Sequence, residues 1–94
     1  MATRNSPVPA AFGAVVRRLR EQQDPEVSQE RLGQRTKRHR NYVGQLERGE
    51  ISPALVAVFE IAQALETTPS ELVRLTEDEL DRGHRAYRRR VPRA

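Results

Sequence analysis

The chain has 94 residues and no cysteine, and its formal net charge is +4, from 17 Lys and Arg against 13 Asp and Glu. This length suffices for one domain, and the lack of cysteine excludes disulfides and thiolate metal sites. No apolar run approaches the roughly 20 residues of a membrane span. The start of the chain also lacks the apolar stretch of a signal peptide. We therefore expect a soluble, cytoplasmic protein with no metal and no cofactor.

The charges are unevenly distributed along the chain. Between residues 31 and 48 there are six cations and one anion, whereas residues 60–81 have seven anions and one cation. This distribution predicts a polyanionic partner for the middle of the chain. A third block, at residues 85–93, has five arginines and no acid. It is either a solvated tail or a segment that folds on a protein partner.

Apolar spacing predicts helices throughout and argues for no strand. After a flexible leader at residues 1–9, the first helix runs from Ala10 to Gln23 and ends at Asp24 and Pro25, because proline removes a backbone donor. Ser28 is a suitable N-cap for a second, short helix. A third helix ends at Arg48, since Gly49 favours the left-handed cap conformation. The predicted inward-facing residues of these helices are Phe12, Val15, Val16, Leu19, Leu32, Val43 and Leu46.

The second half of the chain repeats cap signals before apolar stripes. Ser52 and Pro53 predict the start of a fourth helix, with Leu55, Val58, Phe59, Ala62 and Leu65 facing the core. Thr68 predicts the cap of a short fifth helix with Leu72, Val73 and Leu75. Thr76 predicts a weakly packed last helix, anchored by Leu80, Tyr87 and Val91. We therefore predict an all-α fold with a folded domain at residues 10–76 and a C-terminal helix or arginine-rich tail at residues 77–94.

A short helix, a polar turn and a second short helix form a helix-turn-helix arrangement, with flanking helices on both sides. Val43 and Leu46 face inward from the third helix, and its opposite face has no apolar side chain. Arginine pairs with guanine edges, and asparagine and glutamine pair with adenine edges. The residues on that face are Arg40, Asn41, Gly44, Gln45 and Arg48. We therefore predict that this helix reads bases in the major groove of double-stranded DNA.

The stretch SQERLGQRTKRHRNYVGQLERGEISPAL resembles the signature of the Cro and phage-repressor-like (XRE-type) helix-turn-helix family of bacterial transcriptional regulators. The likeness also includes VRRLR before the motif and IAQAL after it, and extends over roughly residues 12–75. It implies a compact, phage-repressor-like domain of four to five helices. It also implies a sequence-specific, nucleoid-associated regulator, in our interpretation a repressor, and no enzymatic activity.

The resemblance further implies a role for individual residues. Arg40, Asn41 and Gln45 correspond to base-reading positions, with Gly44 between them on the same face. Glu47 resembles a buried acid that pairs with an arginine of the first helix, here Arg20. Tyr42 either stacks on the sugar-phosphate backbone or packs beside the second helix. The residues expected at the DNA backbone are Gln29, Lys37, Arg38, His39, Tyr42 and Arg48.

The turn departs from the family pattern at three positions. Lys37 stands where the family commonly has glycine, so it is expected in a left-handed conformation at a cost on the order of 1 kcal/mol. Arg38 replaces a small apolar residue. His39 stands where serine or threonine is usual, so a weaker cap is expected. These departures predict a looser turn and leave the reading face intact.

One recognition helix reads only a few base pairs, so we expect a homodimer on a roughly palindromic operator. The predicted dimer surfaces are the fifth helix, with Leu72, Val73 and Leu75, and the segment around Leu80 and Tyr87. The alternative function is a protein-interaction or antitoxin-type partner module with the same fold. In that alternative the C-terminal segment contacts the protein partner.

Overall fold

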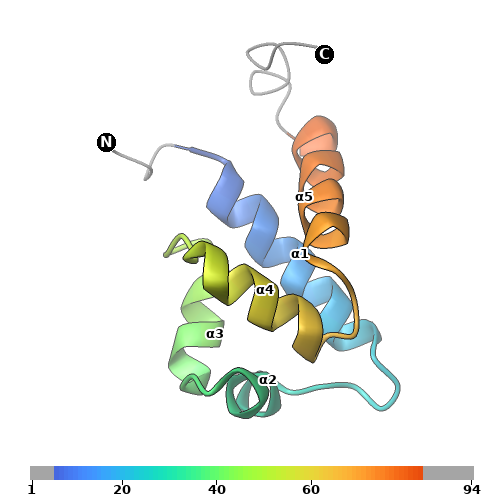
Figure 1. The fold of residues 1–94 in the computed structure, drawn as a ribbon. Coiled ribbons are helices and arrows are strands. Elements are labelled where there is room, and N and C mark those ends of the chain that lie inside the picture. The colour runs from blue at the N-terminus through green and yellow to red at the C-terminus, as the bar shows by residue number, and fades with distance from the viewer. Residues whose placement is uncertain (1–5, 84–94) are drawn as a thin grey trace.

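The computed structural model describes residues 6–83, and within this range the chain forms five helices and no strand. Their bounds are Val8–Gln22 (α1), Gln29–Thr36 (α2), Arg40–Glu47 (α3), Leu55–Ala64 (α4) and Pro69–Gly83 (α5). In Figure 1, α2 lies at the opposite end of the molecule from the start of α1 and the end of α5. The all-α prediction is confirmed.

One apolar core holds all five helices together. Val15 and Val16 of α1 are fully buried, and they belong to one cluster with residues from every other helix. Burial of such side chains contributes about 1.5–3 kcal/mol each, which makes this cluster the main source of stability. The other buried members of the cluster are Phe12, Val27, Leu32, Val43, Leu46, Ile61, Ala62, Leu65 and Leu72.

The helix ends follow the cap signals at three places. The Ser28 Oγ accepts a hydrogen bond from the Arg31 N–H at 3.0 Å, and the Thr68 Oγ1 accepts one from the Glu71 N–H at 3.1 Å. Gly49, just after α3, has φ +75°, the left-handed conformation predicted for it. At the other end of the sequence, α1 begins at Val8, so the last two residues of the predicted leader are helical. Residues 1–5 lie outside the described residues.

The predicted start and buried stripe of α4 are partly wrong. The helix begins at Leu55, with Ala54 and not Ser52 as its N-cap. Leu55 is 72% exposed and Phe59 is 55% exposed, whereas Ala57 and Ile61 face the core in their place. Eight of the ten residues in LVAVFEIAQA are apolar, so spacing alone does not identify the face that turns inward.

The predicted break at Thr76 is also wrong. α5 continues from Pro69 to Gly83, so the domain boundary predicted at residue 76 falls inside this helix. The Thr76 side chain is buried and its Oγ1 donates to the Leu72 carbonyl oxygen at 2.7 Å, which is a bond within the helix and not a cap. Leu80 is only 1% exposed, so this part of the chain is well packed. Tyr87, Val91 and the arginines at residues 85–93 lie outside the described residues.

Candidate nucleic-acid interface

A polar hollow lies along the exposed edge of α3. Arg40, Asn41, Gly44, Gln45 and Arg48 line it together with Gln29 from the start of α2, and its volume is about 250 Å³. Within residues 6–83, the side chains of Arg40, Asn41 and Gln45 make no hydrogen bond or ion pair. The structure thus brings together the four predicted base-reading residues and leaves three side chains with unused donors and acceptors.

The opposite face of α3 fixes the direction of this edge. Val43 and Leu46 are 2% and 0% exposed, as their spacing predicts. α1 crosses α3 so closely at Gly13 that an added Cβ would lie 2.7 Å from the Glu47 carbonyl oxygen and nearer still to that of Leu46. The sequence analysis did not predict this close crossing, because its only signal is a glycine inside a predicted helix.

A buried ion pair joins α1 to the end of α3. Arg20 Nε donates to Glu47 Oε2 at 2.7 Å and Nη2 donates to Oε1 at 3.0 Å, which is the pairing that the resemblance implies. The side chains are only 7% and 3% exposed. The hydrogen bond to Glu47 is the main cause that raises the pKa of Arg20. Because both charges are desolvated, loss of either partner would leave the other as a buried charge without a partner, which is strongly destabilising. The pair therefore fixes α3 on α1.

Gln29 extends this ion pair to α2. Its Nε2 donates to Glu47 Oε1 at 2.9 Å, so α1, α2 and α3 meet at one carboxylate. One amide hydrogen of Gln29 is therefore used inside the protein. The side chain also lines the polar hollow. This placement suits a residue that orients the third helix while it borders the exposed edge.

The turn between α2 and α3 has the left-handed residue expected from the sequence. Lys37 has φ 59° and ψ 39° and caps α2. The Arg38 N–H donates to the Gly33 carbonyl oxygen at 2.7 Å. The Lys37 side chain is exposed and no ion pair involves it in the described part of the chain. Lys37 therefore adds an uncompensated cation beside α3.

Arg38 differs from its neighbour because its half-buried side chain has partners within the protein. Its Nη1 donates to the carboxylate of Glu60 on α4, and to the Thr36 carbonyl oxygen at 3.0 Å. Its guanidinium lies over the Tyr42 ring, 5.2 Å from the ring centroid. The hydrogen bond to Glu60 is the main cause that raises the pKa of Arg38. Sequence reasoning missed this partner, since Glu60 lies 22 residues away on a helix whose inward face it had misjudged.

His39 and Arg48 lie at the two ends of α3. The His39 Nδ1 accepts a hydrogen bond from the Asn41 N–H at 3.0 Å, so an imidazole provides the N-cap. Arg48 Nε donates to Glu50 Oε2 at 2.7 Å, which raises the pKa of Arg48 and lowers that of Glu50. Both members of this pair are about half exposed, at 60% and 49%. An exposed pair is weak, so Arg48 is free to exchange its partner for another anion.

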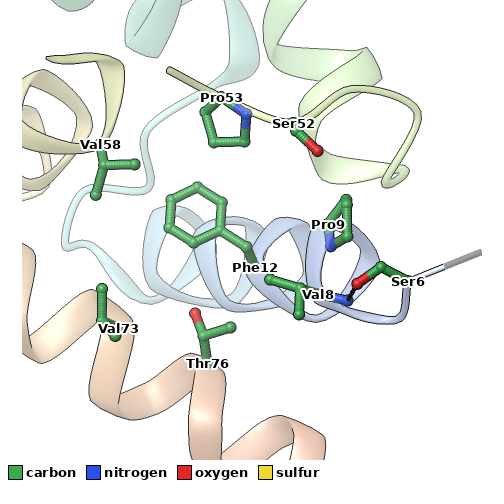
Figure 2. A pocket seen from close by; sticks show the side chains of 9 residues that line it. All are labelled: Ser6, Val8, Pro9, Phe12, Ser52, Pro53, Val58, Val73 and Thr76. Carbon is green, nitrogen blue, oxygen red and sulfur yellow. Dashed lines mark hydrogen bonds between the residues drawn. The ribbon is translucent and has the colours of Figure 1, made fainter. Parts of the chain in front are cut away.

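A second hollow, away from α3, is apolar. Figure 2 shows the Phe12 ring pointing between Pro53, Val58 and Val73, and the hollow has a volume of about 310 Å³. Its lining has no charged side chain. The remaining lining residues are Ser6, Val8, Pro9, Ser52 and Thr76.

Within residues 6–83, no group of three His, Asp or Glu side chains is arranged to hold a metal ion. None of the described helices combines the length and the apolar character needed to cross a membrane.

Comparisons with known proteins agree with this geometry. Residues 11–75 match the model of a family described as a helix-turn-helix domain. The controller protein C.AhdI of a restriction-modification system, from Aeromonas hydrophila, is 38% identical, with a TM-score of 0.62 over 67% of this chain and 92% of that chain. The clp gene regulator ClgR from Corynebacterium glutamicum has a TM-score of 0.73 over 87% of each chain at 20% identity, which shows a shared fold. The comparison with curated proteins gave no match.

Proposed function

The chain belongs to the XRE-type helix-turn-helix family of DNA-binding transcriptional regulators, and we propose that it acts as a repressor that reads an operator with α3. The observation that carries this proposal is the exposed edge of α3. Three side chains that match base edges point from this edge without a partner in residues 6–83, while the back of the helix is locked in the core. The major groove of B-DNA is wide enough to admit an α-helix.

We assign base reading to Arg40, Asn41 and Gln45. Arginine makes a bidentate contact with O6 and N7 of guanine, whereas the two amides suit N6 and N7 of adenine. Gly44 lies between these side chains and has no Cβ, so the backbone of α3 approaches the floor of the groove. A good bidentate contact contributes about 1–3 kcal/mol of discrimination against the wrong base.

We assign contacts with the DNA backbone to the residues around this edge. Lys37 is an unpaired cation in the described chain, and Arg48 has only an exposed partner. Gln29 and His39 lie at the starts of α2 and α3, where backbone N–H groups and the helix dipole favour a phosphate. Tyr42 and Arg38 are half-buried and contact each other, so phosphate contacts from them require a rearrangement.

We propose a homodimer whose contact face differs from the one that the sequence predicts. Leu72 and Leu80 are 0% and 1% exposed and are therefore unavailable, Leu75 packs on the core, and Tyr87 lies outside the described residues. Within residues 6–83, the large apolar side chains that are at least half exposed lie on α4 and at one position of α5. They are Leu55, Val56, Phe59 and Val73. Exposed apolar side chains that lie together, as the three on α4 do, are typical of a protein interface.

A dimer places two copies of α3 in successive major grooves, about 34 Å apart. This arrangement predicts an operator with two-fold symmetry. We further propose that the protein acts in the cytoplasm, on the nucleoid, and that it has no enzymatic activity. A protein partner at the C-terminal segment stays a prediction, since residues 84–94 lie outside the described residues.

Fluorescence anisotropy with two duplexes tests the proposal. The operator duplex is selected by the protein from random DNA, and the control is its scrambled version of equal length and composition. We expect binding to both to weaken steeply with salt, with at least about a 1,000-fold preference for the operator. If the two affinities are equal at every salt concentration, the chain is a protein-interaction module and not a sequence-specific regulator.

A further inference from the structure

An ion pair connects α4 to the turn that precedes the recognition helix. Arg38, which lies in the turn two residues before the start of α3, donates to Glu60 on α4. The same guanidinium lies over the ring of Tyr42 on α3. The Arg38 side chain is 24% exposed and that of Glu60 is 44% exposed. Arg38 therefore contacts the turn, α3 and α4 at once.

This pairing distinguishes Arg38 from the cations on either side of it. Lys37 and Arg40 are exposed and make no ion pair in the described chain. Arg48 is paired, but with the exposed Glu50, from which it separates easily. Arg38 is more enclosed than Arg48 and has a carboxylate, a carbonyl oxygen and an aromatic face as partners. Among Lys37, Arg38, Arg40 and Arg48, Arg38 is thus the cation most firmly held by the protein itself.

The position of the Arg38 guanidinium in the DNA complex determines how strongly the protein prefers the operator over other DNA. A guanidinium that reaches a phosphate strengthens binding to every DNA sequence alike, because phosphate contacts carry no sequence information. A guanidinium that stays against Tyr42 and Glu60 adds nothing to that attraction. It instead holds the start of α3 in one position, and base contacts depend on that position.

We propose that Glu60 is a specificity-determining residue that retains Arg38 on the protein when α3 enters the groove. Glu60 acts through Arg38 and touches no base, so it is a positioning residue. The inference rests on the proposed function, since it refines how the same α3 edge separates the operator from other DNA.

Glu60→Gln tests this inference with the operator and scrambled duplexes across a range of salt concentrations. We expect the released Arg38 to reach a phosphate. The slope of log affinity against log salt then becomes steeper by about 0.9, the value for one added phosphate contact. Near 0.1 M salt, affinity for the scrambled duplex rises by up to about eightfold. The operator duplex gains less, because α3 loses its fixed position and with it part of the base contacts, so the preference for the operator falls. An unchanged slope together with an unchanged preference overturns the inference.

Glu71→Gln is the matched control. It makes the same change in net charge and also removes one carboxylate partner of an arginine, because Glu71 Oε2 accepts from Arg74 Nη2 at 2.7 Å on α5, while Asp78 Oδ2 keeps its own bond to Arg74 Nη1 at 2.9 Å. α5 packs mainly against α1 and α4. The expected result is a wild-type slope. A slope as steep as that of Glu60→Gln would mean that net charge alone is responsible, which overturns the inference.

Arg38→Gln provides a second, independent variant. If Arg38 is retained by Glu60, its loss leaves the salt slope unchanged and weakens operator binding only. A slope shallower by about 0.9 would show that Arg38 already contacts a phosphate in the wild type, and would overturn the inference. Wild-type protein that prefers no duplex would overturn the proposed function and this inference together. A wild-type preference with unaltered variants overturns the inference alone.

Discussion

Lys37 occupies a backbone conformation that suits glycine better than lysine. Its φ of 59° brings the Cβ of an L-residue close to the following carbonyl, at a cost of about 1 kcal/mol or more. We expect Lys37→Gly to be more stable than Lys37→Ala by about 1 kcal/mol, since both remove the charge and only glycine relieves the conformation. Urea denaturation of the two variants measures this difference. Equal midpoints with equal slopes would contradict it.

Gly13 is required by the close crossing of α1 and α3. A Cβ at this position would lie 2.7 Å from the backbone carbonyl oxygen of Glu47, and backbone cannot move aside cheaply. We expect Gly13→Ala to lower the free energy of unfolding by about 1–3 kcal/mol or more, as overpacking does. Thermal unfolding followed by circular dichroism is the measurement.

Gly83 at the end of α5 is the matched control for that change. A Cβ there would meet no atom within 4 Å. Gly83→Ala is therefore expected to leave the stability unchanged or to raise it slightly. Equal losses from both glycine substitutions would show that helix content, and not the crossing, determines the effect at Gly13.

Single residues were predictable where the signal is local or belongs to a family pattern. The caps at Ser28 and Thr68 follow from nearby sequence. The left-handed Lys37 and the Arg20–Glu47 pair are present as the resemblance implies. The partner of Arg38 was not predictable, because Glu60 comes within reach of Arg38 only through the way α4 packs in the folded chain.

At the scale of the element, Gly44 separates the stability of α3 from its proposed function. An added Cβ would lie 3.1 Å from Nη1 of the flexible Arg48 side chain and 3.8 Å from Gln29 Oε1, which is an ordinary contact. We expect Gly44→Ala to raise the free energy of unfolding by up to about 1 kcal/mol, because alanine favours a helix more than glycine does. We also expect weaker operator binding, since the methyl group occupies the edge that enters the groove. Stability and operator affinity that rise together would contradict this assignment.

The helices differ in how far their sequences determine them. α2 and α3 have polar and apolar faces, so spacing identified both the elements and their inward sides. α4 is apolar on most of its surface, and the choice of its inward face depends on α2 and α5, against which it packs. The sequence wrongly predicted a break in α5 at Thr76, because a threonine followed by acidic residues looks like an N-cap even when it lies inside a continuous helix. Packing against α1 keeps it continuous.

At the scale of the whole molecule, the apolar face of α4 predicts association between copies. Phe59 is 55% exposed and lies one turn from Leu55 on the same helix. We expect Phe59→Glu to dissociate the dimer and to weaken operator binding, because a buried charge without a partner is costly at an interface. Sedimentation equilibrium with and without the operator measures the mass.

Gln22→Glu is the control for the dimer prediction. It adds the same charge at an exposed position of α1, on a different helix from Leu55, Val56 and Phe59. We expect it to remain dimeric. Wild-type protein that stays monomeric at micromolar concentration, alone and on DNA, would refute the homodimer.

The central claim is that the exposed edge of α3 selects bases, and selection from random duplexes by the wild type and by Gln45→Ala tests it most directly. The expected wild-type result is one enriched sequence with two symmetric halves. Gln45→Ala is expected to lose the preference, for adenine, at one position in each half and to keep the others. Identical enriched sequences from both proteins, or none from the wild type, would contradict the claim.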